Sequence, residues 1–222
     1  MDAILDFIQS NKRLFDAAYA VSAVVNLVGW GLGAMLLYSA WRRRGIKSVS
    51  IGPINFQVQE EAVVATAAAE RNWNAREARP GVNVAKVRSI IGRAFEPHVF
   101  DNLVGKSILW VDDTPSNNRL AVRAIEKVGI DVEQCVSTEQ GLAELDKRHF
   151  DLIISDMGRG ANMQAGYELL AKVRERGSKV PFFIFSSSDR PEFRQEAERR
   201  GAQLSTNDML ELMDQIISRL GT

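Results

Sequence analysis

Acidic and hydroxyl side chains follow three short apolar runs in the second half of this 222-residue sequence. Asp112 and Asp113 follow the first run, Asp156 follows the second and Ser186 follows the third. If these runs are parallel strands, their carboxyl ends share one edge of a sheet, where such sheets place their working site. Three carboxylates at one edge repel one another, and a hard divalent cation such as Mg²⁺ offsets that repulsion. A carboxylate beside Mg²⁺ can attack a phosphoryl group, and a neighbouring hydroxyl can bind the new phosphate. The alternative is that these residues only cap strand ends and begin helices.

Alternating strands and helices are predicted from Ser107 to Leu220, and they would position these side chains. Three of the predicted strands are apolar throughout, which is typical of parallel strands buried on both faces. The predicted strands are Ser107–Val111, Asp131–Val136, Leu152–Ser155, Val180–Phe185 and Ala202–Leu204. The predicted helices are Pro115–Lys127, Thr138–Arg148, Tyr167–Arg176, Pro191–Arg200 and Asp208–Leu220. This order predicts an α/β fold with a five-stranded, doubly wound parallel sheet.

The region from 105 to 222 resembles the receiver domain of bacterial two-component response regulators. The segments that carry the resemblance are Ile108–Asp113 (ILWVDD), Asp151–Asp156 (DLIISD) and Phe182–Ser186 (FFIFS). The resemblance implies a flavodoxin-like fold with strand order 2-1-3-4-5. It also implies a histidine kinase or other signalling protein as partner. The protein would itself be phosphorylated rather than turn over a substrate, so we do not expect an enzyme.

The same resemblance assigns roles to individual residues. It implies that Asp156 is the phosphoacceptor and that Ser186 contacts the phosphate. The implied Mg²⁺ ligands are Asp112, Asp113, Asp156 and the backbone carbonyl of Gly158.

The sequence departs from this family at the end of the last strand. The family has a lysine there that contacts the phosphate, whereas Thr206 or Asn207 takes its place here. A fixed positive charge beside the acyl phosphate is therefore missing from this strand. The loop after Asp156 is longer than is usual in the family and contains Arg159. This arginine either swings toward Asp156 and supplies the lost charge or is solvated.

An uncharged stretch near the N-terminus, 17–41, is long enough to cross a ~30 Å hydrocarbon core as a helix. Arg42, Arg43 and Arg44 follow it, and fewer basic residues precede it. The stretch predicts a single-pass membrane anchor, and this excess predicts that the C-terminal domain lies in the cytoplasm, with 1–16 as a short extracytoplasmic segment. Together with the resemblance to a bacterial family, this implies the bacterial inner (cytoplasmic) membrane. Gly29 and Gly33 have the G-x-x-x-G spacing that lets membrane helices pack closely, so a homo-oligomer is possible.

Residues 42–104 are predicted to be a juxtamembrane connector. Ser48–Gln59 has alternating apolar residues around Gly52-Pro53, which favours a bent strand or short hairpin. Glu60–Arg79 is rich in Ala, Glu and Arg and should be helical. Val82–Phe95 is predicted to be an amphipathic helix, and its apolar face needs a partner. That partner is the next domain, a second copy of the chain or another protein.

A formal net charge of zero argues against a nucleic-acid binder. The lone Cys135 cannot form an intrachain disulfide, and we interpret it as a core residue. Two functions are consistent with these features.

The leading interpretation is a membrane-anchored, receiver-like signalling protein that accepts phosphate on Asp156 with Mg²⁺ in a phosphorelay. The alternative is a pseudo-receiver that binds a partner or small ligand without phosphorylation and acts through its membrane helix, as a stress or defence effector would. The missing lysine favours this alternative, and the intact acidic set favours the leading interpretation.

Overall fold

The computed structural model describes residues 52–188 and 190–222. The predicted membrane helix at 17–41, the segment before it and the Gly29/Gly33 pair lie outside these residues. Within the described ranges, no helix combines the length and the apolar character needed to span a bilayer.

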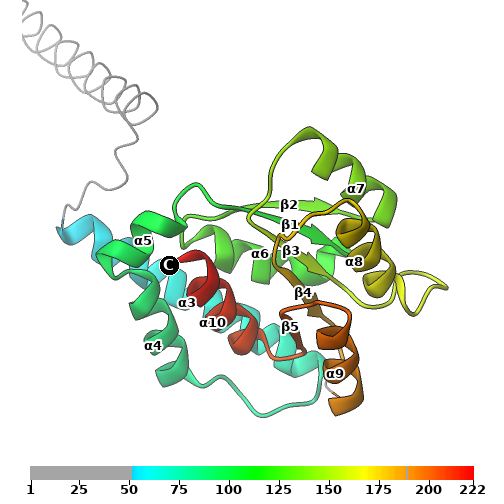
Figure 1. The fold of residues 1–222 in the computed structure, drawn as a ribbon. Helices are drawn as coiled ribbons and strands as arrows, with labels where there is room; N and C mark the ends of the chain where they lie inside the picture. The colour runs from blue at the N-terminus through cyan, green and yellow to red at the C-terminus, as the bar shows by residue number, and fades with distance from the viewer. Residues whose placement is uncertain (1–51, 189) are drawn as a thin grey trace, which may run out of the picture. The chain divides into compact units, whose positions relative to one another are not determined.

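Five parallel strands form the central sheet, in the order β2-β1-β3-β4-β5 (Figure 1). The strands are β1 (Ser107–Val111), β2 (Asp131–Cys135), β3 (Leu152–Ser155), β4 (Phe182–Phe185) and β5 (Leu204–Thr206). Every residue of β3 and β4 is buried, as continuously apolar strands covered on both faces should be. The predicted doubly wound parallel fold and its strand order are confirmed.

Helices cover both faces of this sheet (Figure 1). They are α6 (Arg119–Glu126) and α10 (Met209–Leu220) on one face, and α7 (Thr138–Lys147), α8 (Ala165–Glu175) and α9 (Pro191–Arg199) on the other. Ile108 and Trp110 of β1 belong to the first core, and Leu109 and Val111 belong to the second. Alternate residues of the strand therefore serve two separate cores, as its two-residue period requires.

The last strand begins later than predicted. β5 is Leu204–Thr206, so the prediction of a strand at Ala202–Leu204 is wrong in its bounds. The reason is the end of α9, where Gly201 adopts a left-handed φ of 94°. The next amide, that of Ala202, donates back to the carbonyl of Ala197 and closes the helix in a Schellman motif. Because this cap uses Gly201 and Ala202, the strand starts only at Leu204.

The described part of the connector starts with a long helix, α3 (Gly52–Arg76). The predicted strand or hairpin over Ser48–Gln59 is therefore wrong from Gly52 onward. Proline is favoured in the first turn of a helix, where its missing N–H is not needed, so Gly52-Pro53 starts this helix instead of bending a strand. A short alternation of apolar residues does not outweigh the helix-forming Ala- and Glu-rich segment that follows it.

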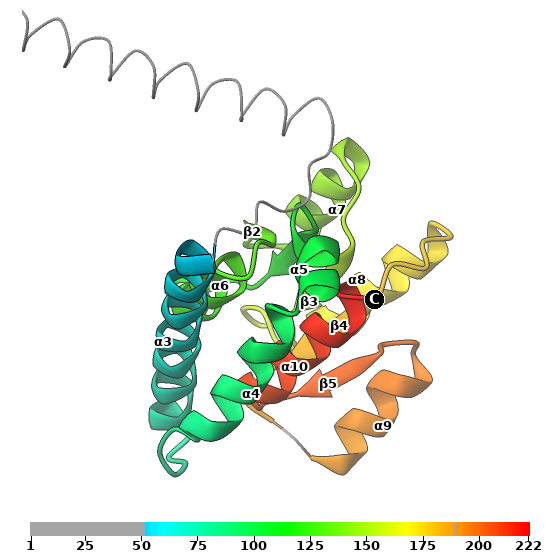
Figure 2. The same cartoon turned by 90° about the vertical axis from the view of Figure 1, so that its left-hand side faces the viewer.

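Two further helices, α4 (Val84–Ala94) and α5 (Pro97–Leu103), complete the connector. The apolar face of α4, formed by Val87, Ile90, Ile91 and Ala94, is buried. It packs against α3 and α10, and α3 also packs along α6 (Figure 2). Of the three partners that the sequence left open for this face, the structure shows the next domain. The described residues consequently form one compact unit.

Candidate functional site

Three carboxylates meet at the carboxyl edge of the sheet. β1 and β3 are paired neighbours, with Val111 opposite Ser155, so the residues that follow them emerge side by side. Asp112, Asp113 and Asp156 each place a carboxylate oxygen within 4.8 Å of the other two. The structure thus brings together the acidic residues that the sequence predicts to act together.

Hydrogen bonds from the chain orient the acidic pair. The Asp112 carboxylate accepts from the backbone amide of Thr114 at 2.7 Å and from the Asn118 side-chain amide at 2.6 Å. The Asp113 carboxylate accepts from the backbone amide of Gly160 at 2.7 Å, which ties it to the loop after Asp156. Asn118 is buried, and sequence reasoning missed it because nothing in its spacing separates it from other residues of a predicted helix.

The three carboxylates repel one another electrostatically. The pKa of Asp156 is raised to about 6, first by burial and then by the charge of Asp112, with a smaller contribution from Asp113. The backbone amide of Met157 and the guanidinium of Arg159 act in the opposite direction. Bringing a hard cation among these oxygens would relieve the repulsion, and an all-oxygen set of this kind suits Mg²⁺. The residues present therefore fit the metal that the sequence predicts.

Ser186 and Gly158 face the same space as Asp156. A hollow of about 580 Å³ is lined by all three residues, together with Asp113 and Tyr167. Ser186 follows β4, and its hydroxyl donates to the carbonyl of Ser188 at 3.3 Å. The hydroxyl and the phosphoacceptor candidate thus share one opening at the sheet edge.

Arg159 neither extends into this hollow nor lies in solvent. Its side chain is buried, with 8% of its surface exposed. One guanidinium nitrogen donates to the Ser155 hydroxyl and the Asp156 carbonyl, at 2.7 and 3.0 Å. The other donates to the Thr138 hydroxyl and the Ala165 carbonyl, at 2.8 and 2.7 Å. The guanidinium therefore fastens β3, α7 and the start of α8 together. Thr138, its partner on α7, is predicted only as the start of a helix, and its contact with Arg159 is not predicted.

Neither candidate at the end of β5 carries a charge into the site. Thr206 is fully buried, and its hydroxyl donates to Glu211 and accepts from the Asp208 amide at 3.0 Å. Asn207 is also buried, and its amide donates to the carbonyl of Ser187 at 3.4 Å. Both residues therefore serve the turn between β5 and α10.

The connector helix reaches the acidic residues from outside the sheet. Trp73 and Arg76 of α3, with Glu77 just after the helix, line a second hollow of about 250 Å³. Asp112, Asp113 and Asp156 line the same hollow. Sequence reasoning missed this contribution because α3 lies far from the acidic residues along the chain. No local sequence pattern predicts which face of α3 packs beside the acidic residues.

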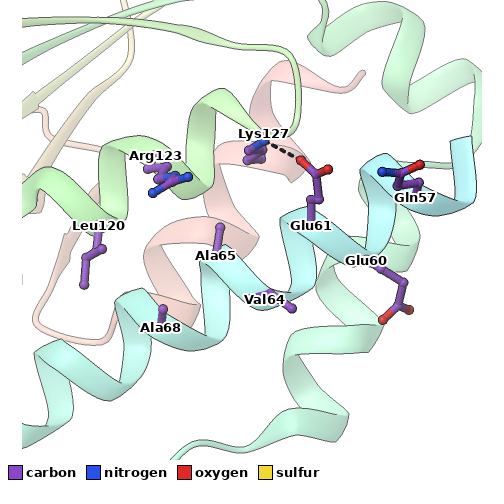
Figure 3. Close-up of a pocket in the computed structure, with 9 residues that line it drawn as sticks. All are labelled: Gln57, Glu60, Glu61, Val64, Ala65, Ala68, Leu120, Arg123 and Lys127. Atoms are coloured by element: carbon purple, nitrogen blue, oxygen red, sulfur yellow. Dashed lines mark hydrogen bonds and ion pairs between the residues drawn. The ribbon is translucent and has the colours of Figure 1, made fainter. Parts of the chain in front are cut away.

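A larger hollow, of about 630 Å³, lies between α3 and α6 and contains none of these acids (Figure 3). Its walls carry Val64, Ala65 and Leu120, and Lys127 and Glu61 form an ion pair of 2.5 Å across it (Figure 3). The chemistry-bearing residues therefore gather at the sheet edge and not in this larger space.

Comparison with known proteins identifies part of the chain. Residues 108–205 match the model of the response regulator receiver domain family. The sensor protein EvgS of Escherichia coli strain K12 is 33% identical over 98 residues, which are 44% of this chain and 8% of that protein. The matched chain thus spans less than a tenth of its curated relative. Asp112, Asp113, Asp156 and Ser186 all lie within the matched residues.

Solved receiver structures are also similar to this chain. The chemotaxis response regulator CheY4 of Vibrio cholerae is 26% identical with a TM-score of 0.44, and the match covers 50% of this chain and 98% of that one. The response regulator TrrA of Thermotoga maritima, solved in complex with Mg²⁺ and BeF, is 19% identical with a TM-score of 0.45. That match covers 52% of this chain and 99% of the other. The family model and the curated relative thus match residues 108–205 to the receiver domain of two-component systems, which supports a role in phosphorelay signalling.

Proposed function

We propose that this receiver domain accepts a phosphoryl group on Asp156 in a phosphorelay, with Mg²⁺ held by Asp112, Asp113, Asp156 and the Gly158 carbonyl. The observation that carries the proposal is the meeting of three carboxylates within 4.8 Å, at the ends of two paired parallel strands. Ser186 lines the same hollow from the next strand.

The chain's own residues divide the work of the transfer. A carboxylate oxygen of Asp156 attacks the phosphorus of a donor phosphohistidine, and the new acyl phosphate forms as the donor imidazole leaves. Asn118 and Gly160 hold Asp112 and Asp113 in place through the hydrogen bonds described above. The Ser186 hydroxyl turns from the Ser188 carbonyl to donate to the phosphate. Bound Mg²⁺ supplies positive charge that offsets the charge on the transferring oxygens.

The anchoring in a bacterial inner membrane, with this domain on the cytoplasmic side, is also part of the proposal. It rests on the uncharged residues 17–41 and on the arginines that follow them. A histidine kinase in the same membrane would then meet the domain close to the bilayer.

Ligand-dependent thermal unfolding of the full-length protein tests the proposal. Mg²⁺ is expected to raise the melting temperature, and beryllofluoride, which mimics an acyl phosphate, is expected to raise it further. Asp156→Asn should abolish the beryllofluoride response. Asp131→Asn is the matched control, because Asp131 is exposed and pairs with the opposite end of β1.

The outcomes separate the two functions considered for this chain. A beryllofluoride response that needs Asp156 supports phosphorylation. Binding of Mg²⁺ without any beryllofluoride response would overturn it in favour of a pseudo-receiver that works by binding alone.

A further inference from the structure

A phosphoryl group at this site would lack a cationic partner from the sheet. Phosphate carries about two negative charges, and on Asp156 it would lie close to the carboxyl groups of Asp112 and Asp113. Mg²⁺ neutralises only part of this charge. Thr206 and Asn207 are uncharged, and their side chains bond to Glu211 and Ser187. Both terminal nitrogens of the Arg159 guanidinium donate to protein groups below the site.

Arg76 of α3 has the positive charge that the end of β5 lacks, and it lies beside the acidic residues. It lines the hollow that Asp112, Asp113 and Asp156 also line. Among the described residues lining the two hollows at Asp156, it is the one with a positively charged side chain. Glu77 lines the same hollow, so phosphate arriving there adds to charge that is already negative.

Two contacts hold the Arg76 guanidinium at the mouth of the site. One of its nitrogens donates to the carbonyl of Asn117 at 2.6 Å, and its central carbon lies 4.9 Å from the Trp73 ring centroid. Trp73 in turn packs on Phe185, with ring centroids 4.3 Å apart, and Phe185 directly precedes Ser186. A guanidinium has five N–H donors, so the bond to Asn117 leaves others for a phosphate.

The end of α3 is fastened beside the position where the family has its lysine. The Trp73 indole N–H and the Arg79 guanidinium both donate to the backbone carbonyl of Asn207, at 2.5 and 2.9 Å. These bonds fix the last turn of α3 against the end of β5. Arg76, between Trp73 and Arg79, is thereby held next to the acidic edge.

From these contacts we propose that Arg76 binds the phosphoryl group on Asp156, so that the connector helix supplies the positive charge that the last strand lacks. This inference rests on the proposed phosphorylation of Asp156. It makes α3 part of the receiver's site even though the helix lies outside the family match.

Beryllofluoride titrations of the full-length protein in saturating Mg²⁺ test the inference, with thermal stability as the readout. Arg76→Gln removes the charge, and Arg76→Lys keeps it. Arg71→Gln is the matched control, because Arg71 is an exposed arginine of the same helix that does not line either hollow. A parallel Mg²⁺ titration without beryllofluoride reports on the metal site alone.

We expect Arg76→Gln to raise the beryllofluoride midpoint about tenfold, the cost of one charge-assisted hydrogen bond. Arg76→Lys should recover most of this loss, Arg71→Gln should match the wild type, and the Mg²⁺ midpoint should stay the same in all variants. An Arg76→Gln midpoint within about twofold of the wild type would overturn the inference, as would a parallel loss of Mg²⁺ binding, which indicates a structural role. If the wild type binds Mg²⁺ but ignores beryllofluoride, the proposed function itself fails and this inference fails with it.

Discussion

Asp156 is an acid whose protonated form the fold favours in the absence of a cation. Its pKa rises from 3.8 to about 6, chiefly through burial and then through Asp112. The folded state therefore holds this proton more tightly than the unfolded chain does. The resulting stabilisation is complete below about pH 3.8 and is lost as the pH rises through about 6.

Asp156→Asn should consequently stabilise the metal-free protein at neutral pH. We expect a gain of about 1–2 kcal/mol in the free energy of unfolding near pH 7.5, after allowing for partial exposure of the carboxyl, and no gain near pH 4. Urea unfolding of both proteins at several pH values measures this difference. A gain that does not depend on pH would contradict the assignment of the raised pKa to Asp156. Saturating Mg²⁺ should reverse the order, because only the wild type keeps the full set of carboxylates.

Asn118 acts on the metal site through Asp112. Its side chain is buried and donates to the Asp112 carboxylate at 2.6 Å. Because partners that orient metal ligands typically contribute 10- to 100-fold to metal affinity, we expect Asn118→Ala to raise the Mg²⁺ midpoint about tenfold. Asn117→Ala is the control, since the adjacent Asn117 is exposed and its contact with Arg76 uses only its backbone carbonyl. Equal Mg²⁺ midpoints for the two variants would refute this role.

At the scale of the elements, Arg159 joins β3, α7 and α8 beneath the site. Arg159→Met removes four hydrogen bonds and leaves the hydroxyls of Ser155 and Thr138 and two backbone carbonyls without this donor. Buried groups that lose their partners cost about 1–3 kcal/mol each when water cannot replace them. We therefore expect Arg159→Met to lower the free energy of unfolding by about 3 kcal/mol, measured by urea denaturation at saturating Mg²⁺. A change below about 0.5 kcal/mol would mean that the four hydrogen bonds of Arg159 contribute nothing measurable to stability.

Local sequence patterns predict the elements well where one pattern acts alone. The apolar runs before Asp112, Asp156 and Ser186 predict the strands that carry these residues, because continuous burial leaves a signal in composition. β5 begins later than predicted because Gly201 and Ala202 form the C-terminal cap of α9. A pattern of apolar residues does not show that a helix cap uses the same residues. Similarly, the start of α3 is missed because Gly52-Pro53 suits both a bend and the first turn of a helix.

At the scale of the whole molecule, the site is larger than the receiver domain that the sequence delimits. The four predicted residues at the strand ends are close in space because parallel strands bring their ends to one edge. The position of Arg76 depends on how α3 docks against Phe185 and Asn207, and these contacts join distant parts of the chain. Hydrophobic periodicity shows that the connector helices need a partner, but it does not show which surface they cover.

The docking of the connector also bears on how a signal would leave the domain. Trp73 of α3 contacts Phe185, the residue before Ser186, so we expect a rearrangement of Ser186 on phosphorylation to shift α3 as well. Along the sequence, α3 is also the first described helix after the proposed membrane anchor.

The central claim is that Asp156 is the phosphoacceptor, and phosphoryl transfer measures it most directly. The full-length protein is incubated with acetyl phosphate and Mg²⁺, and its intact mass is followed by mass spectrometry. We expect one added phosphoryl group in the wild type and in Asp131→Asn, none when Mg²⁺ is chelated before acetyl phosphate is added, and none in Asp156→Asn. An unmodified wild type that still binds Mg²⁺, or an adduct that persists in Asp156→Asn, would contradict it.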